Sequence, residues 1–527
     1  MPEYLAPGVY VEEIERGPKP IEGVPTSTTA FLGETERGPT KPRLVTSYGE
    51  YLRIFGDVFT NATGDPKYLP YAVKSFFDNG GRRAYIARIV GAGGVIAKLV
   101  AAPFTIEAVG PGAASNRIWV RFEPGSTADA SGKPLGFRLL IFYWDRPASN
   151  VPFDPVTDTT TLPRPSATEL FDDLRFEADS PNYWDKRVNH GNSALVTLTV
   201  APGTTMAAFP ATPPTVPPTP LVTPGPLAGG VDPPAVPGSA DYLGYDAQID
   251  KRTGLSALAL DPYRDIAIVA APGAPDVAVK EVITHCQNNR YRFAVIDSAA
   301  NVAVSGNLDP RSDPKIGDTK YAAFYYPWIW VSDPRSGARI KIPPSGAVCG
   351  IYGLSDNTRG VWKAPANETV AGAIDLEFDV THGEQEILNP RGVNVIRRFP
   401  GRGIRVWGAR TLSSDPLWKY INVRRLFIFL EASIYNSTQW VVFEPNDPKL
   451  WARVKQTITL FLRSQWREGA LFGEKEEEAF SVAVGRETMT EDDILNGRLI
   501  VEIGIAPVRP AEFVVFRIYQ KTSEAKE

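Results

Sequence analysis

The chain has 527 residues, of which 43% are apolar and 22% charged, so we expect two to four domains with their own hydrophobic cores. Lysine plus arginine (56) nearly balance aspartate plus glutamate (60), and the net charge of −4 argues against a dedicated nucleic-acid-binding protein. Two cysteines cannot build a disulfide framework and suit a reducing cytoplasm. Neither a secretory signal nor a membrane span is expected, because no apolar run of the required kind occurs.

The first 95 residues indicate an extended arm followed by the start of a globular core. Four prolines exclude a helix from residues 1–20, where Val9, Tyr10, Val11 and Glu12 belong to a short β-prone run. Residues 21–95 are expected to form the N-terminal part of the core. The pattern there predicts a buried strand at 29–33, a helix at 68–78 and a strand at 84–89.

Residues 96–240 read as a β-rich region that ends in a proline-rich segment. Twelve prolines fall within 201–240, where Asp232 is the single charged residue. Such a segment is expected to be an extended surface excursion without helix or sheet ladders. The strands predicted before it are 117–122, 137–144 and 194–200.

Residues 241–372 change to a strand–helix–strand pattern. The predicted elements, a strand at 265–271, a helix at 276–289 and a strand at 292–296, form a βαβ unit and hence a small parallel sheet. The turn before the helix contains Pro272 and Pro275, which lack the backbone N–H groups that a phosphate cradle needs. A structural βαβ unit is therefore favoured over a nucleotide site.

The sequence lacks the motifs of most enzyme classes. It has no G-x-x-x-x-G-K-[ST] phosphate loop and no G-x-S-x-G nucleophile elbow. We expect Cys286 and Cys349 to be buried, His285 and His382 to be structural or surface groups, and the acidic run 474–478 to be a solvated loop. No catalytic residue, cofactor or metal site is predicted. An enzyme on the 241–372 core stays open as an alternative, and it would require a pocket with perturbed ionisable groups.

Residues 373–510 are expected to form a C-terminal domain with two helices. The first is predicted over 422–439, and the second over 447–468, framed by Asp447 as N-cap and by Gly469 as terminator. The face of the second helix opposite its apolar residues is basic. This face is either simply solvated or a docking surface for an acidic protein partner, and it consists of Lys449, Arg453, Gln456, Arg463 and Arg467.

The last residues form a second β-prone terminus. Strands are predicted at 497–505 and 512–519, split by a proline-containing segment, and residues 511–527 form a C-terminal arm that includes Phe513, Val514, Val515, Phe516 and Arg517. Each terminus is either an edge strand of the chain's own sheet or an arm that completes a neighbour's sheet. Arms passed from subunit to subunit make heterologous contacts, which build open helices.

A series of short blocks occurs along the chain: PGVYVEEI (7–14), GVPTSTTAFLG (23–33), RGP (37–39), FFDNGG (76–81), PPSG (343–346), GVWKAPA (360–366), NPRGVN (389–394), GRGIRVWGART (401–411), WKYINVRR (418–425), FEPN (443–446) and EIGIAPVRPAEF (502–513). Together and in this order, these blocks resemble the contractile tail sheath family of phage tails, pyocin-type particles and phage-like contractile injection systems. They extend from residue 7 to residue 513, whereas 96–240 matches no pattern of the family.

The resemblance implies a mixed α+β and α/β multidomain fold, with a central α/β domain, a β-rich outer region and a C-terminal sheet completed by neighbouring subunits' arms. It also implies a structural, non-enzymatic subunit that stacks as hexameric rings around an inner tube and contracts to drive that tube through a target envelope. Its partners would be other copies, the inner tube protein, and baseplate and terminator or cap proteins, with no direct nucleic-acid or membrane contact. Assembly is expected in the bacterial cytoplasm, within a phage tail or injection particle.

The basic helix face is our own nomination for the tube contact, since the resemblance does not identify those residues. Within the family, the alternative is a phage virion sheath rather than an injection-system sheath. Outside it, the alternatives are the α/β enzyme and a monomeric surface adhesin.

Overall fold

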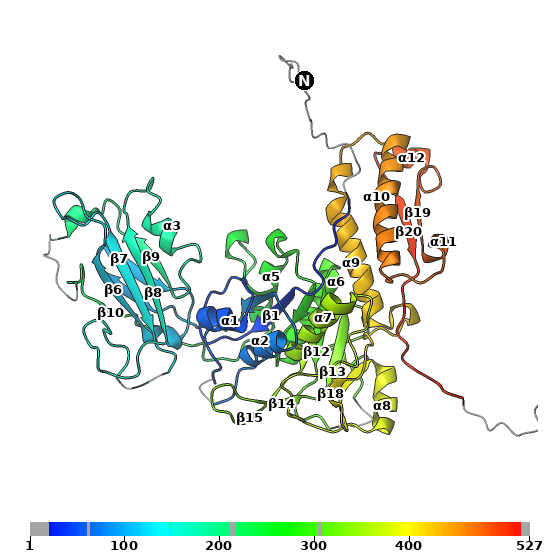
Figure 1. Cartoon of the computed structure of the whole chain (residues 1–527), viewed down its shortest axis with the longest axis horizontal. Coiled ribbons are helices and arrows are strands. Elements are labelled where there is room, and N and C mark those ends of the chain that lie inside the picture. Colours follow the sequence, from blue (N-terminus) through cyan, green and yellow to red (C-terminus); the bar gives the residue numbers. More distant parts are fainter. Residues whose placement is uncertain are drawn as a thin grey trace, which may run out of the picture. The chain divides into compact units, whose positions relative to one another are not determined.

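The computed structural model describes residues 20–60, 64–146, 148, 150–209, 218–303 and 308–517. The chain divides into two compact units (Figure 1). The C-terminal unit contains residues from 425 onward together with 360–362 and the segment ending at Val24, and the larger unit contains 25–359 and 363–424. The predicted N-terminal β-run, Val9–Glu12, lies outside the described residues.

The larger unit is built around a sheet of eight strands in its described part, in the order β18-β17-β13-β12-β11-β1-β3-β2. The six inner strands run parallel, and the two edge strands are antiparallel to their neighbours. Their bounds are β1 (Thr29–Gly33), β2 (Arg43–Val45), β3 (Ala84–Arg88), β11 (Ile268–Ala270), β12 (Phe293–Asp297), β13 (Ala322–Tyr326), β17 (Val393–Phe399) and β18 (Gly403–Val406).

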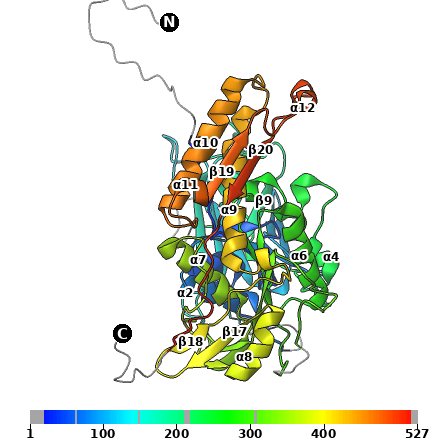
Figure 2. The same cartoon turned by 90° about the vertical axis from the view of Figure 1, so that its right-hand side faces the viewer.

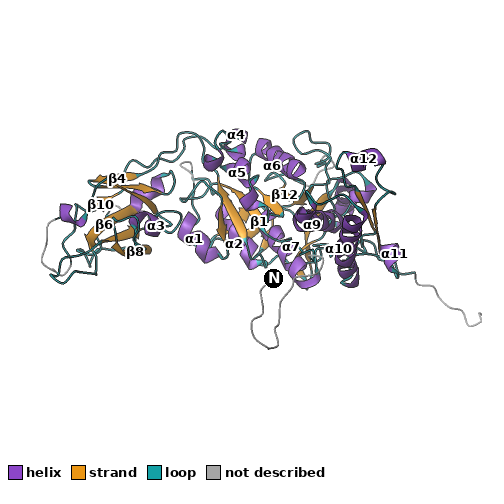
Figure 3. Ribbon diagram, turned by 90° about the horizontal axis from the view of Figure 1, so that it is seen from above, coloured by secondary structure: helices purple, strands orange, loops and turns teal. Residues whose placement is uncertain are grey.

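Helices cover both faces of this sheet, which explains why its inner strands are apolar without alternation. Phe31 of β1 meets Phe76 of α2 (Leu69–Asp78), with ring centroids 5.3 Å apart. On the same face, the Tyr325 hydroxyl lies 2.8 Å from that of Tyr352 on α7 (Ser345–Arg359). The opposite face packs on α6 (Asp276–Asn289) and α5 (Gly254–Leu258) (Figure 3).

The predicted βαβ unit is confirmed as β11, α6 and β12, but it is not a small separate sheet. Strands β1 and β3 come from the segment 21–95, and β17 and β18 come from the segment expected to start the C-terminal domain. The structure therefore divides the chain near residue 425 rather than at 373. Strand pairing over such sequence distances has no local signature.

Residues from about 95 to 231 form the predicted β-rich region, and its described part contains two sheets, β10-β6-β7-β8 and β4-β5-β9. Aromatic residues fill the space between them, and the Phe104 and Phe122 rings stack at 4.0 Å. The bounds are β4 (Lys98–Ala101), β5 (Phe104–Ala108), β6 (Ile118–Pro124), β7 (Phe137–Tyr143), β8 (Ala167–Leu174), α3 (Trp184–Val188), β9 (Val196–Val200) and β10 (Gly225–Pro226).

The proline-rich segment was wrongly predicted to form no ladder. Its strand β10 pairs with β6, and the backbone N–H groups of Leu221 and Leu227 donate to the carbonyl oxygens of Phe122 (2.8 Å) and Ile118 (2.9 Å). Residues between the prolines supply these donors, so an edge strand tolerates the prolines. Residues 210–217 of this segment lie outside the described residues.

The C-terminal unit packs two helices against a two-stranded sheet (Figure 2). Helix α10 starts as predicted, because the Leu450 N–H donates to the Asp447 carboxylate (2.8 Å), and Gly469 follows its end with φ +92°. The elements are α9 (Ile421–Ser437), which begins in the larger unit, α10 (Pro448–Arg467), α11 (Glu476–Ala479), β19 (Phe480–Val484), α12 (Glu491–Leu495) and β20 (Val501–Ile505). The other α-helices and strands in the described part of the larger unit are α1 (Tyr48–Phe55), α4 (Ser239–Leu243), β14 (Ile329–Ser332), β15 (Arg339–Ile342), β16 (Asp375–Leu376) and α8 (His382–Leu388).

Candidate intersubunit interface

The sheet of the C-terminal unit is small and has one buried face. Strands β19 and β20 run antiparallel, with Val482 opposite Ile503. The apolar side chains of both strands pack with those of α10, whereas Ser481, Glu502 and Gly504 face away from the core. A sheet of only two strands is marginally stable in water. Packing against helix α10 stabilises the sheet of β19 and β20.

Both outer edges of this sheet are open within the described part of the chain, since no third strand pairs with either. The Ala506 N–H donates to the Ala479 carbonyl (2.9 Å) and so points toward the β19 side. Because main-chain groups alternate along a strand, those of Ile503 and Ile505 point to the opposite, outer edge. By the same alternation, the main-chain groups of Val482 point outward from β19. Both edges therefore present a row of donors and acceptors to another strand.

The C-terminal segment of the described chain is apolar and exposed. Residues 511–517 form no strand or helix, and exposure reaches 71% for Phe513, 68% for Val514, 77% for Val515 and 83% for Phe516. Arg517 is also exposed. Four consecutive large apolar residues in water are costly unless another surface covers them. These residues keep the sequence features of a strand but have no ladder in the described chain.

The basic face of α10 is present, but nearby acids partly neutralise it. Lys449, Gln456 and Arg467 are exposed, as is Arg453, which lies 3.8 Å from Glu444 and over the Trp440 ring. Arg463 donates two hydrogen bonds to Glu476, at 2.7 and 2.9 Å. This pairing raises the pKa of Arg463 and lowers that of Glu476. The acid that pairs with Arg463 comes from α11 rather than from α10 itself, so the residue pattern along the helix does not reveal this pairing. The run 474–478 is accordingly not a plain loop.

A second basic feature, the hairpin of β17 and β18, was identified from the sequence only as a block typical of the family. Five arginines and no acidic residue occur between 397 and 410, and this imbalance was a readable signal. Arg398 pairs with Asp375 and lies 3.5 Å from Asp379. Arg402 and Arg405 lie at the tip. Among the described residues, Arg402 donates to the side-chain oxygen of Asn367, and Arg405 donates to the carbonyl oxygens of Asn367 and Arg402.

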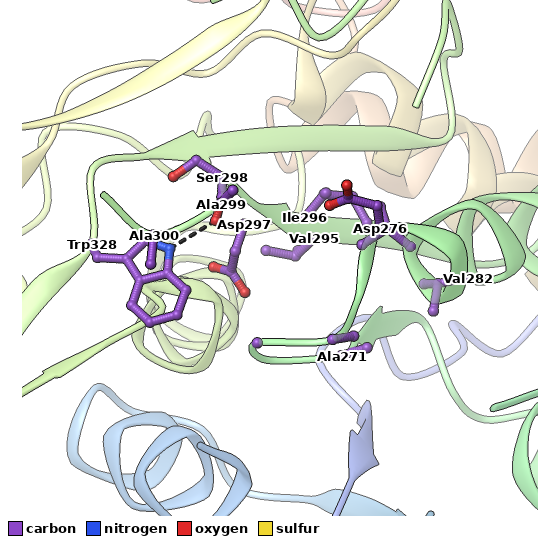
Figure 4. Close-up of a pocket in the computed structure, with 13 residues that line it drawn as sticks. Ala271, Asp276, Val282, Val295, Ile296, Asp297, Ser298, Ala299, Ala300 and Trp328 are labelled. Atoms are coloured by element: carbon purple, nitrogen blue, oxygen red, sulfur yellow. Dashed lines mark hydrogen bonds between the residues drawn. The ribbon is translucent and has the colours of Figure 1, made fainter. Parts of the chain in front are cut away.

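A cavity of about 220 Å³ lies at the carboxyl ends of β11 and β12, where α/β sheets often bind ligands (Figure 4). Asp297 in its wall is partly buried, and the loss of solvation around its carboxylate raises its pKa to about 7. Both carboxylate oxygens accept hydrogen bonds from Ser345, one from its N–H (2.7 Å) and one from its hydroxyl (2.5 Å). The Trp328 indole N–H donates to the Ser298 carbonyl (2.7 Å). Asp297 thus anchors the start of α7 to β12.

His285, Cys286 and Cys349 are core residues, and His382 is a surface residue. His285 is buried with its Nε2 atom 2.6 Å from Arg292, and desolvation lowers its pKa to about 3. Cys286 and Cys349 are buried, as predicted, and burial raises the pKa of Cys286 to about 12. His382 is exposed. Among the described residues, no group of three or more potential metal ligands occurs, and none of the helices combines the length and the hydropathy of a transmembrane segment.

Two family models match adjoining parts of the chain. The phage tail sheath protein central domain matches residues 236–412, and the phage tail sheath C-terminal domain matches 413–521. Together they span more than half of the chain.

Individual tail sheath proteins share this sequence similarity. A "Putative prophage major tail sheath protein" of Pseudomonas aeruginosa is 24% identical over 292 residues, which is 52% of this chain and 71% of that protein. The tail sheath protein of Vibrio phage KVP40 is 21% identical over 266 residues, 50% of this chain and 38% of that protein.

Solved structures share the fold over the whole length. The sheath complex of the extracellular contractile injection system PVC in its contracted state has a TM-score of 0.58 at 23% identity, covering 99% of this chain and all (100%) of that one. The contracted helical sheath of the anti-feeding prophage AFP has a TM-score of 0.57 at 24% identity, covering 98% and 100%. The chain therefore belongs to the contractile tail sheath family and is a structural subunit of a contractile sheath.

Proposed function

We propose that this chain polymerises as stacked hexameric rings around an inner tube and that its terminal arms complete the β19–β20 sheets of neighbouring copies. The most direct support is that the C-terminal unit contains both a sheet with open edges and a strand-like segment that joins no β-ladder in the described chain. The sheet has two open edges, and the segment 511–517 has strand-forming residues without a ladder. If the segment 511–517 of one copy paired with an open edge in a neighbouring copy, the edge and the segment would both gain main-chain hydrogen bonds. The N-terminal run Val9–Glu12 is proposed for the second edge from its sequence alone.

Strand addition suits a lattice that must change shape without dissociating. Each main-chain hydrogen bond contributes about 0.5–1.5 kcal/mol net. Burial of each Phe or Val side chain adds about 1.5–3 kcal/mol. Pro507 pairs with Leu471 in an isolated bridge, whereas Pro510 lies beyond it and precedes the C-terminal arm, so the chain can turn at Pro510 without loss of that pairing.

Contraction requires an extended state that is kinetically trapped and a compact state of lower free energy. A bias of about 1–2 kcal/mol per subunit suffices when many subunits move together. A shift from 1:99 to 99:1 needs only about 5.5 kcal/mol in total. Sheath–tube contacts must therefore be weak enough to break, and exposed ion pairs, typically about 0–1 kcal/mol, meet that requirement.

We nominate the basic face of α10 for the contact with an acidic inner tube. Lys449, Gln456 and Arg467 are exposed, and Arg453 is exposed although it lies 3.8 Å from Glu444. Arg463 is engaged with Glu476 and contributes by orienting α11. Baseplate and terminator or cap proteins would bind the two ends of the polymer. Assembly in the bacterial cytoplasm is part of the same proposal.

An injection-system sheath is favoured over a phage virion sheath by the extent of the match. The PVC and AFP sheath structures align over 99% and 98% of this chain, which includes its β-rich region. The enzyme alternative is not favoured, because both carboxylates that line the cavity are engaged, Asp297 with Ser345 and Asp276 with Lys315.

The test is assembly of the purified chain, measured by sedimentation and negative-stain microscopy. We expect the intact chain to form tubes or stacked rings, and a chain that ends at residue 510 to stay folded but unassembled. Val515→Pro should reproduce the truncation, because proline removes a ladder donor, while Val515→Thr should assemble normally. Wild-type-like tubes from both the truncation and the proline variant would refute strand donation, and a monomeric intact chain would support the adhesin alternative.

A further inference from the structure

The tip of the β17–β18 hairpin, residues 397–405 and hereafter the basic hairpin, holds cations in a fixed position. The Arg402 guanidinium lies 5.6 Å from the centroid of Phe399 and 5.7 Å from that of Trp407, and it donates to the Asn367 side-chain oxygen (2.8 Å). Arg405 donates to the Asn367 carbonyl (2.7 Å). Within the described residues, neither arginine has a carboxylate partner among its ion pairs or hydrogen bonds. Their charges are thus positioned but not neutralised.

A hollow of about 600 Å³ adjoins the basic hairpin. Ile374, Phe399 and Ile404 form apolar parts of its wall. Its two charged wall residues, Arg398 and Asp379, lie 3.5 Å apart and pair with each other, so the unneutralised cations beside the hollow are Arg402 and Arg405. Ile374 is half exposed (48%), so an apolar surface faces solvent next to unneutralised arginines. This combination fits an aromatic or aliphatic side chain flanked by carboxylates.

The C-terminal unit presents such a group at the turn between α10 and β19, residues 472–478, hereafter the acidic turn. Phe472 is 72% exposed, and Glu474, Glu477 and Glu478 are also exposed. Among the described residues these three glutamates have no cationic partner within ion-pair distance. The acidic turn therefore carries an aromatic knob beside uncompensated negative charge.

Several contacts make the acidic turn rigid. The Phe472 N–H donates to the Ala506 carbonyl (2.8 Å), and the Trp466 indole N–H donates to the Gly473 carbonyl (3.0 Å). Gly473 has φ +136°, and a side chain there would lie 2.9 Å from the Cβ atom of Glu478. The ion pair between Arg463 and Glu476 holds the start of α11 against α10. A surface that is ordered before binding loses little conformational entropy on docking.

We propose that the acidic turn of one copy docks on the basic hairpin of a second copy, with Phe472 in the hollow and Glu474 and Glu477 facing Arg402 and Arg405. This inference rests on the proposed self-assembly and names a contact separate from the arms. The two surfaces differ, so the contact is heterologous and extends into a polymer rather than closing a dimer. Charge pairs at the rim of this contact determine how the two surfaces align and which surface is recognised. Phe472 supplies the apolar burial at its centre.

The experiment is a charge swap in the full-length chain. Arg402→Glu with Arg405→Glu, and separately Glu474→Arg with Glu477→Arg, should each raise the protein concentration needed for polymerisation in sedimentation by about tenfold, because one lost contact of about 1.4 kcal/mol lowers the association constant by that factor. The chain with all four changes should regain wild-type polymerisation, because the opposite charges face each other again. Asp250→Arg with Lys251→Glu, two exposed positions elsewhere, is the matched control and should assemble normally.

A second pair of variants covers the case in which the reversed hairpin misfolds. Arg402→Gln with Arg405→Gln removes the charges but keeps donors for Asn367, and it should melt like wild type while it polymerises poorly. Phe472→Ala should weaken assembly more than Phe472→Leu. Normal polymerisation of the charge-neutral hairpin, or a folded fourfold swap that gains nothing over its parents, would overturn this contact while the wild-type polymer leaves the proposed function standing. A wild-type chain that forms no polymer would overturn both.

Discussion

The carboxylate of Asp297 accepts two hydrogen bonds from Ser345, one from the first backbone N–H of α7 and one from its hydroxyl. This joins the carboxyl end of β12 to the helix that carries Tyr352 under the sheet. In an α/β fold this edge is the usual place for a ligand. Here the acidic side chain is used to position a helix.

Burial of Asp297 predicts a pH-dependent stability of the larger unit. The pKa of Asp297 is raised from its ordinary value to about 7, so the folded chain holds one more proton than the unfolded chain between about pH 4 and that value. The free energy of unfolding should therefore fall as pH rises through this window, by at most about 1.4 kcal/mol per pH unit for this group. Urea unfolding of wild type and Asp297→Asn at several pH values measures it. Parallel curves for the two proteins would show that Asp297 does not titrate there.

The open edge of β20 predicts that Ile503→Pro blocks strand acceptance. The main-chain groups of Ile503 point outward, so proline removes a donor offered to a neighbour while the β19–β20 ladder stays intact. Ile503→Ala is the control, because it removes the side chain that packs with α10 but keeps the N–H. We expect both variants to lose some thermal stability and only the proline variant to lose polymerisation in sedimentation. Equal assembly by the two variants would argue against an arm on this edge.

The basic face of α10 predicts a salt-dependent attachment to the inner tube. Lys449→Glu with Arg453→Glu should reduce co-sedimentation of tube with extended sheath, and rising ionic strength should weaken the wild-type contact, because exposed ion pairs are screened. Arg463→Glu should instead act on the acidic turn, which would exchange its amide hydrogens faster. Attachment that is insensitive to both salt and the double reversal would return this face to plain solvation.

Both thiols should be inert in the folded protein. Cys286 and Cys349 are buried, and burial raises the pKa of Cys286 to about 12, so little thiolate forms at pH 8. A thiol reagent should label neither cysteine in the native chain and both after unfolding in guanidinium chloride. Rapid labelling of the native chain would show that one of these sites opens.

The sequence by itself determined the local elements and the family. Helix α10 was bounded correctly, because an N-cap, a proline at the first helical position and a terminating glycine act within a few residues of each other. The βαβ unit of β11, α6 and β12 was found for the same reason, since hydrophobic periodicity is a short-range signal. The exposed, strand-like residues Phe513–Phe516 were identified from composition alone.

Only the tertiary structure decided which elements share a sheet and which charges are neutralised. Strands β1 and β3 lie in the same sheet as β11 and β17, which are hundreds of residues away in the sequence. Apolar strands have similar sequences, so the sequence does not specify the order of the strands in the sheet. Arg463 meets Glu476 because the chain reverses at Gly473, whereas Arg402 and Arg405 meet no carboxylate in the described chain. Ion pairing depends on distances of a few ångströms between groups that folding brings together, so composition predicts how many charges exist but not which of them remain available to a partner.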